Sequence, residues 1–170
     1  MPNKKIKIAV FEAAEWEKPF LKDRLKSYDA VFFGNALDEN NADKAKDFTI
    51  ISVFIYSKIN KKALGKLKNL KLITTRGTGF DHIDVGECKK RKITVCNMPT
   101  YGENTVAEHT FALMLNLTRK INKAWERTRR FDFSQKGLRG IDLQGKTLGV
   151  IGVGNIGKHV IRIAKGFEMN

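Results

Sequence analysis

Short apolar runs alternate with amphipathic stretches along the first hundred residues. The runs are rich in β-branched and aromatic residues, whereas the stretches between them repeat apolar positions at helical spacing. The predicted strands are Lys5–Phe11, Asp29–Phe33, Phe48–Tyr56, Lys71–Thr75 and Ile93–Cys96. The predicted helices are Glu15–Lys26, Asn40–Lys46, Lys61–Leu70 and Asp84–Lys92. Strands that alternate with helices indicate a parallel sheet, so residues 1–99 are predicted to form a flavodoxin-like, doubly wound α/β domain with Phe48–Tyr56 as a buried central strand.

A different pattern follows Pro99. The apolar positions predict one long helix from Thr105 to Arg129, and then a polar connection. A new buried strand at Lys146–Ile151 and a helix at Ile156–Phe167 come after it. Residues 100–170 are therefore predicted to be a long helix followed by one strand–helix unit of a further α/β domain.

The chain is strongly basic. Its 170 residues include 32 lysines and arginines against 18 acids, which gives a formal net charge of +14. The basic residues gather in runs at Lys58–Lys71, Lys89–Lys92 and Arg119–Arg130, and such runs can attract nucleic acid or anionic membranes. The two lysine-rich runs contain no aromatic residue that could stack on bases. We interpret the runs as solvated helix faces and do not expect a nucleic-acid partner.

Cysteine content and hydropathy suggest the compartment. Cys88 and Cys96 are too few for a disulfide framework or a zinc site. The longest apolar stretch, Phe48–Tyr56, is far shorter than the ~20 residues that span a bilayer, and no leader pattern opens the chain. We expect a reduced cytoplasmic protein with no membrane partner.

The glycine-rich segment near the carboxyl terminus is the sharpest motif. Gly152-Val153-Gly154-Asn155-Ile156-Gly157 is a GxGxxG that follows a predicted strand and opens a predicted helix. Gly152 would allow the tight turn, Gly154 the approach of a pyrophosphate, and Gly157 close packing of the helix, whose free N–H groups favour phosphate. The alternative is an ordinary turn between a strand and a helix. The motif predicts a dinucleotide site. The acid that would bind the ribose and separate NAD from NADP lies ~20 residues beyond such a motif, past Asn170, so both cofactors stay open.

A second glycine pair follows the fourth strand, in Thr75-Arg76-Gly77-Thr78-Gly79-Phe80-Asp81. Backbone N–H groups beside a strand end can hold an anion such as a carboxylate. A plain turn that leads to a helix cap at Asp84 is the alternative interpretation.

Few residues qualify for acid–base chemistry. His82, His109 and His159 are the only histidines, and each is interpreted as structural or exposed. Nucleophile motifs, a Walker loop and metal-ligand spacing are absent. No residue of this chain is therefore assigned a catalytic role.

Taken together, three segments in this order resemble the D-isomer-specific 2-hydroxyacid dehydrogenases. They are Arg76-Gly-Thr-Gly-Phe-Asp-His-Ile-Asp84, Tyr101-Gly-Glu-Asn-Thr-Val-Ala-Glu-His109 and Leu148-Gly-Val-Ile-Gly-Val-Gly-Asn-Ile-Gly157. The segments at Ile8–Lys22, Val53–Tyr56 and Phe133–Gln135 look most similar to the D-lactate dehydrogenase branch. The resemblance implies a flavodoxin-like substrate domain, an NAD-binding Rossmann domain, and an active site in the cleft between them.

The resemblance also implies roles for single residues. The N–H groups of Thr78 and Gly79 would hold the substrate carboxylate, and Tyr56 and Tyr101 would line the substrate pocket. Val106 would touch the nicotinamide, and Gly152–Gly157 would cradle the pyrophosphate. The implied partners are a small 2-oxo or 2-hydroxy acid and a second copy of the chain in a homodimer.

The family's catalytic Arg, Glu and His lie in its second half, so the resemblance implies that this chain is an N-terminal fragment without activity of its own. Pyruvate and D-lactate are the expected substrate pair. Glyoxylate, hydroxypyruvate or 3-phosphoglycerate are alternatives within the family. The alternative from another class is a non-catalytic, corepressor-like binding protein.

Overall fold

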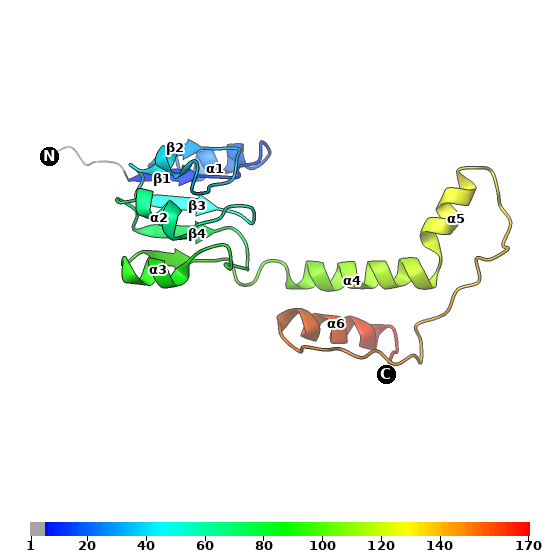
Figure 1. The fold of residues 1–170 in the computed structure, drawn as a ribbon. Coiled ribbons are helices and arrows are strands. Elements are labelled where there is room, and N and C mark those ends of the chain that lie inside the picture. The colour runs from blue at the N-terminus through cyan, green and yellow to red at the C-terminus, as the bar shows by residue number, and fades with distance from the viewer. Residues whose placement is uncertain (1–5) are drawn as a thin grey trace. The chain divides into compact units, whose positions relative to one another are not determined.

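Five parallel strands form the sheet predicted for the first part of the chain, in the order β2-β1-β3-β4-β5 (Figure 1). The computed structural model describes residues 6–170, so Lys5 of the predicted first strand lies outside the described residues. The strands are β1 (Lys7–Val10), β2 (Asp29–Phe32), β3 (Ile50–Val53), β4 (Leu72–Thr75) and β5 (Thr94–Cys96). The helices are α1 (Lys18–Arg24), the 3₁₀ helix η1 (Ala42–Ala45), α2 (Lys61–Lys66), α3 (Val85–Lys90), α4 (Glu103–Thr118), α5 (Ile121–Thr128) and α6 (Asn155–Gly166). The predicted α/β class is confirmed, with elements shorter than expected.

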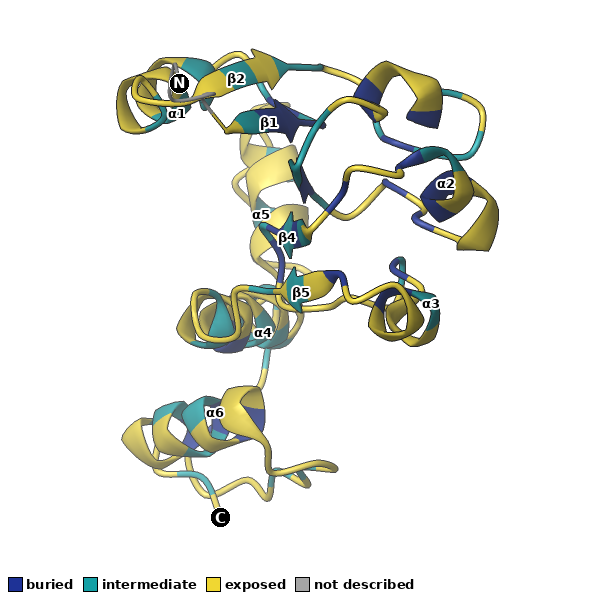
Figure 2. Cartoon of the chain, turned by 90° about the vertical axis from the view of Figure 1, so that its left-hand side faces the viewer, coloured by how far each residue is buried: buried dark blue, intermediate teal, exposed yellow. Residues whose placement is uncertain are grey.

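The chain divides into two compact units, residues 1–99 and residues 100–170. In the first unit two apolar clusters lie on opposite faces of the sheet, since successive side chains of a strand point to opposite sides. Ala9 and Phe11 join the core beneath α2 and η1, whereas Ile8 and Val10 pack on the α1 side. β3 lies at the centre of the sheet, as predicted, and Ile51 and Val53 are fully buried. Its neighbour β1 is also largely buried (Figure 2).

Polar side chains set where two helices of the first unit begin. The Asn60 side chain accepts a hydrogen bond from Ala63 N at 2.9 Å, and the Asp84 side chain accepts one from Glu87 N at 2.8 Å. Both residues therefore cap helices, α2 and α3, whose first N–H groups have no partner inside the helix.

The second unit corrects the prediction of one long helix over Thr105–Arg129. α4 starts at Glu103 and ends at Thr118, and α5 follows after Lys120, whose φ of 57° is left-handed. In a continuous helix Thr118 O would accept from Asn122 N, but here it accepts from Ile141 N at 3.0 Å. Asn122 N donates instead to the Asn116 side chain. The break thus coincides with a contact to the later segment at residue 141, which helical periodicity does not reveal.

The predicted strand at Lys146–Ile151 is also corrected. Within residues 6–170 this segment belongs to no sheet. Leu148 N donates to Asn170 O and Asn170 N donates to Lys146 O, each at 2.8 Å, and Lys146 N donates to Leu143 O at 3.0 Å. A strand requires a neighbouring strand for its hydrogen bonds, and the described part of this unit supplies none. The helix predicted after it is present as α6.

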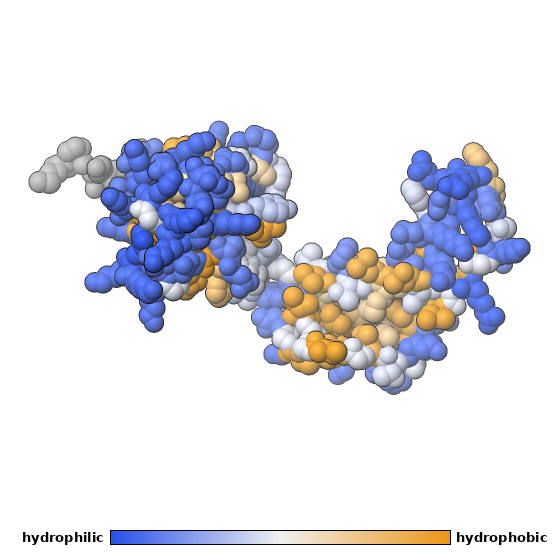
Figure 3. Space-filling model, viewed as in Figure 1, coloured by the Kyte–Doolittle hydropathy of each residue, from blue (hydrophilic) through white to orange (hydrophobic). Residues whose placement is uncertain are grey.

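α4 and α6 pack against each other and form the core of the second unit. Phe111 stacks on Phe167 with ring centroids 5.3 Å apart, and Ala107, Val160 and Ala164 are buried beside them. Apolar side chains also gather on the visible surface over α4 and α6 (Figure 3). The exposed ones in this unit include Val106, Leu113, Leu117, Ile151, Val153 and Ile156. No helix among residues 6–170 is long and apolar enough to cross a membrane.

Candidate functional site

The loops that follow β1, β3 and β4 emerge at one edge of the sheet, because the strands are parallel neighbours. Chain order reverses between β1 and β3, since β1 continues to β2 on one side and β3 continues to β4 on the other. Ligands of open α/β sheets bind at this edge. The candidate site of the first unit is therefore built from Phe11–Glu12, the Phe54–Ser57 loop and the Arg76–Gly79 loop.

The Arg76–Gly79 loop is fixed against the end of β5. Met98 N donates to Gly77 O at 3.0 Å, the Thr78 hydroxyl donates to Met98 O at 3.0 Å, and the Asn97 side chain donates to Thr78 O at 2.8 Å. Within residues 6–170 the backbone N–H groups of Thr78 and Gly79 donate to no acceptor. A β-carbon at Gly79 would meet only Asp81 Oδ2, at 3.9 Å, so the space beside these donors is open. Two exposed N–H groups on a rigid loop suit a small anion.

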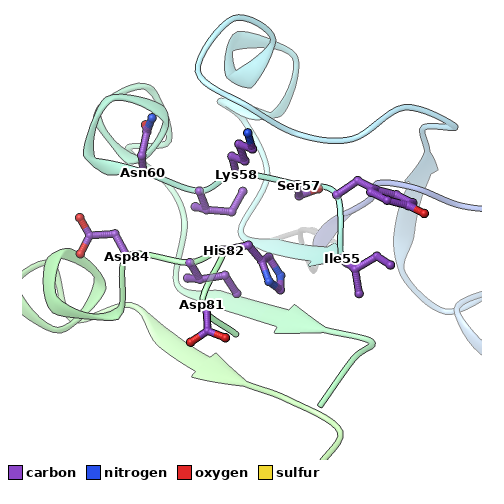
Figure 4. Close-up of a pocket in the computed structure, with 10 residues that line it drawn as sticks. Ile55, Ser57, Lys58, Asn60, Asp81, His82 and Asp84 are labelled. Carbon is purple, nitrogen blue, oxygen red and sulfur yellow. The ribbon is translucent and has the colours of Figure 1, made fainter. Parts of the chain in front are cut away.

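Tyr56 stands in the loop after β3 and is 74% exposed. It lines a pocket of about 530 Å³ between this loop and the Asp81–Asp84 turn (Figure 4). The Lys58 and Asp81 side chains point in opposite directions in this view, so these two charged groups do not converge on one point in the pocket. The lining residues are Ile55, Tyr56, Ser57, Lys58, Ile59, Asn60, Asp81, His82, Ile83 and Asp84.

His82 lies in the wall of this pocket, and its Nε2 is buried without a hydrogen-bond partner among the described residues. Its carbonyl accepts from Ile59 N at 2.8 Å, which links the two loops. Of the other histidines, His109 is exposed on α4, and His159 lies 3.4 Å from Arg162 on α6. The described residues include no cluster of His, Cys, Asp or Glu that could hold a metal ion.

Glu12 organises this edge, although the sequence pattern marked it only as a strand end and assigned it no role. Its carboxylate accepts from Tyr56 N at 2.7 Å, Phe54 N at 2.9 Å and Ser57 N at 3.2 Å, and also from the Ser57 hydroxyl. The only signal in the sequence is an acid directly after a buried strand, at the end where ligands bind.

Arg76 ties the same edge together from the other side. Its guanidinium donates to Phe11 O at 3.0 Å, Glu12 O at 2.9 Å and the Ser52 hydroxyl at 3.1 Å, and it lies 3.5 Å from the Glu17 carboxylate. Only arginine presents several donors in one rigid plane, so a single side chain joins β1, β3 and β4.

The glycine-rich turn of the second unit has the geometry that a phosphate cradle needs. Gly152 has a φ of 90°, a conformation that residues with a β-carbon rarely adopt. A β-carbon at Gly157 would lie 2.3 Å from Gly152 O, whereas one at Gly154 would meet nothing within 4 Å. Gly154 caps α6 without a side-chain hydrogen bond, so no cap side chain occupies the N-terminus of this twelve-residue helix.

The remaining predicted residues also lie in the second unit. Val153, Asn155 and Ile156 are exposed in the turn, and the Asn155 amide donates to Glu103 at 3.3 Å. Tyr101 is 58% exposed just before α4, and Val106 is 47% exposed in its first turn. Their roles toward substrate and cofactor stay predictions.

Comparison with known proteins places this geometry in a family. The sequence profile of the D-isomer specific 2-hydroxyacid dehydrogenase catalytic domain matches residues 8–161. A 2-hydroxyacid dehydrogenase homolog of Haemophilus influenzae is 36% identical over 169 residues, which cover 97% of this chain and 51% of that protein. The D-lactate dehydrogenase of Escherichia coli is 35% identical over 168 residues, which cover 96% and 51%.

A solved structure supports the same family. The D-lactate dehydrogenase of Aquifex aeolicus, complexed with NAD and lactic acid, is similar with a TM-score of 0.86 and 36% identity, covering 95% of this chain and 49% of that one. This chain thus spans about half the length of the relatives it matches. Both the sequence profile and the fold identify it: the chain belongs to the D-isomer specific 2-hydroxyacid dehydrogenases.

Proposed function

We propose that residues 1–99 bind the carboxylate of a small 2-oxo acid and that residues 100–170 begin the nicotinamide-cofactor unit of a D-2-hydroxyacid dehydrogenase. The observation that carries the proposal is the pair of free N–H groups on Thr78 and Gly79, held by hydrogen bonds to the end of β5. Fixed donors are effective for binding an anion because they need no rearrangement when it arrives.

The second unit fits a dinucleotide. The uncapped start of α6, the left-handed Gly152 and the open space at Gly154 would hold the pyrophosphate, and Val106 would touch the nicotinamide. The bound cofactor would supply the hydride for reduction of the oxo acid. We propose NAD as that cofactor, and the NAD complex of the Aquifex aeolicus enzyme supports it. NADP is the alternative.

Pyruvate and D-lactate are the proposed substrate pair, and the similarity to D-lactate dehydrogenases supports them. The binding-protein alternative gains no support from the basic helices. Lys62 and Lys66 of α2 pair with Glu39 and Asp43, as solvated faces commonly do. A homodimer in the cytoplasm completes the proposal.

The proposal assigns no acid–base group to this chain. His109 is exposed, His159 contacts Arg162, and His82 faces a pocket with no partner for its buried nitrogen. We expect the purified 170-residue chain to oxidise no NADH in the presence of pyruvate. Measurable turnover by the mass-verified chain would show that it carries its own proton donor.

The decisive assay uses the product of the complete reading frame that encodes this chain. Reduction of pyruvate, glyoxylate, hydroxypyruvate and 3-phosphohydroxypyruvate is followed with NADH and with NADPH. The proposal expects pyruvate with NADH to give the highest kcat/KM and the product to be D-lactate. A preference for another acid would overturn the substrate assignment, and no reduction of any acid would overturn the enzyme assignment.

A further inference from the structure

Two neighbouring loops at the ligand edge of the first unit present backbone N–H groups. In one loop these groups donate to an acceptor within the described residues, and in the other they do not. The loop after β4 leaves the N–H groups of Thr78 and Gly79 unused within the described residues. The loop after β3 directs the N–H groups of Phe54, Tyr56 and Ser57 at the Glu12 carboxylate. Such a set of converging N–H groups is an anion site, and here the protein's own anion fills it.

The backbone holds Glu12 in this place at a cost. Its φ of 54° lies in the left-handed region, where the β-carbon of a residue other than glycine is strained. Glu12 N donates to Asn35 O at 3.0 Å, and Glu12 O accepts from Arg76 at 2.9 Å, so both ends of the residue are fixed. Strained residues that their surroundings hold in place are frequent at functional sites.

The loop after β3, whose N–H groups bind Glu12, carries Tyr56, the residue that is proposed to line the substrate pocket. Tyr56 N donates to one oxygen of the Glu12 carboxylate, while Phe54 N, Ser57 N and the Ser57 hydroxyl share the other. Ser57 is fully buried, and its Oγ also accepts from Leu37 N at 2.9 Å, so the far end of the loop is anchored in the core. With both ends fixed, the backbone of Tyr56 has one defined position.

Arg76 extends the same hydrogen-bond network to the Arg76–Gly79 loop. It contacts Phe11 O, Glu12 O and the Ser52 hydroxyl through its side chain, and its own residue begins the Arg76–Gly79 loop. Arg76 N also donates to Val53 O at 2.9 Å, next to Phe54. Glu12 and Arg76 thus link the ends of β1, β3 and β4 at the edge of the sheet where ligands of such folds bind.

We propose that Glu12 is a positioning residue, an internal carboxylate that occupies the anion site after β3, fixes Tyr56, and leaves Thr78 and Gly79 as the N–H pair that takes the substrate carboxylate. This inference rests on the proposed function and adds a residue to it. Charge-assisted hydrogen bonds from several N–H groups to one carboxylate are strong enough to order a loop of this length.

The test is amide NMR on the 170-residue chain, with oxamate as the substrate analogue. In the wild-type chain we expect oxamate to shift the amides of Thr78 and Gly79 and to leave those of Phe54, Tyr56 and Ser57 in place. Glu12→Gly removes the carboxylate at a position whose backbone favours glycine. We expect it to move the three loop amides and to weaken oxamate binding about tenfold, the loss expected for one misplaced hydrogen-bonding group.

Rescue separates positioning from a general loss of structure. With oxamate at saturation, acetate should return the Phe54, Tyr56 and Ser57 amides of Glu12→Gly toward their wild-type shifts, because it refills the empty anion site. Glu12→Gln keeps one oxygen, so we expect a smaller loss in which the Tyr56 amide, facing the new NH₂ group, changes most. This variant also serves if Glu12→Gly does not fold. Glu15→Gln is the matched control, since Glu15 is exposed and pairs only with Lys18.

The outcomes are distinct. If oxamate leaves Thr78 and Gly79 unshifted in the wild-type chain, the proposed carboxylate site is wrong. If the wild-type chain binds oxamate but Glu12→Gly binds it equally well, or keeps its loop amides unchanged, the positioning role of Glu12 is wrong and the proposed site stands.

Discussion

Gly157 packs directly on the carbonyl oxygen of Gly152, where a β-carbon would lie 2.3 Å from that oxygen. No side chain fits at this distance without moving the turn or the helix. The contact brings the start of α6 against the glycine-rich turn, and no side chain caps this end of the helix. The same contact therefore supports both the fold of the second unit and its proposed phosphate site.

Gly157→Ala should destabilise the second unit by about 1–3 kcal/mol, the usual cost of forcing extra atoms into a packed site. Gly166→Ala is the control in the same helix, because a β-carbon there meets nothing within 4 Å. It should be neutral or stabilising by up to about 1 kcal/mol. Urea unfolding followed by Trp125 fluorescence in a Trp16→Phe background reports on this unit. Equal stability of the two variants would contradict the packing argument.

Lys120→Gly should stabilise the second unit by about 0.5–1 kcal/mol. Lys120 is left-handed at the break between α4 and α5, where glycine avoids the strain that a β-carbon causes. Lys123→Gly, inside α5, is the control and should cost about 1 kcal/mol or less. The same fluorescence measurement distinguishes them. Destabilisation by Lys120→Gly would mean that α4 and α5 join in solution.

Asp84→Ala should destabilise the first unit by about 1 kcal/mol, because the α3 cap to Glu87 N at 2.8 Å is lost. Asp84→Asn keeps a side-chain oxygen at the same position and should lose little. Thermal unfolding by circular dichroism compares the two substitutions. A loss of the same size in both would assign the role of Asp84 to its charge and not to the hydrogen bond.

Burial raises the pKa of the Cys88 thiol, and the negative charge of Asp84 adds to the increase. The unfolded chain ionises at the ordinary thiol pKa of about 8.5, below that of the folded chain. The stability that Cys88 contributes is therefore complete below about pH 8.5 and is lost as the pH rises toward the folded value. The difference in unfolding free energy between the wild-type chain and Cys88→Ala should narrow as the pH rises from about 8 to about 10. A constant difference would contradict the shift.

The two thiols should also differ in reactivity. Cys96 is exposed and Cys88 is buried, so iodoacetamide should modify Cys96 first in the folded chain. Peptide mass spectrometry locates the label. Fast labelling of Cys88 in Cys96→Ser would show that α3 opens readily.

The five-stranded parallel sheet, the α/β class and the family were all predictable from the sequence. A strand that is buried on both faces of a sheet has a continuous apolar sequence, as around Ile51 and Val53. Such a run is visible within a few consecutive residues. The glycines of the Gly152–Gly157 turn were equally readable, because a left-handed φ and a close backbone approach both require the absence of a side chain.

The end of α4, the lack of strand pairing at Lys146–Ile151 and the role of Glu12 were visible only in the folded chain. Each involves a partner distant in sequence: Ile141 N donates to Thr118 O, Leu148 N donates to Asn170 O, and Ser57 lies 45 residues from Glu12. Helical or strand periodicity records only which face of an element is apolar. Periodicity does not show which distant backbone group or carboxylate accepts a given N–H, because these partners meet only when the chain folds.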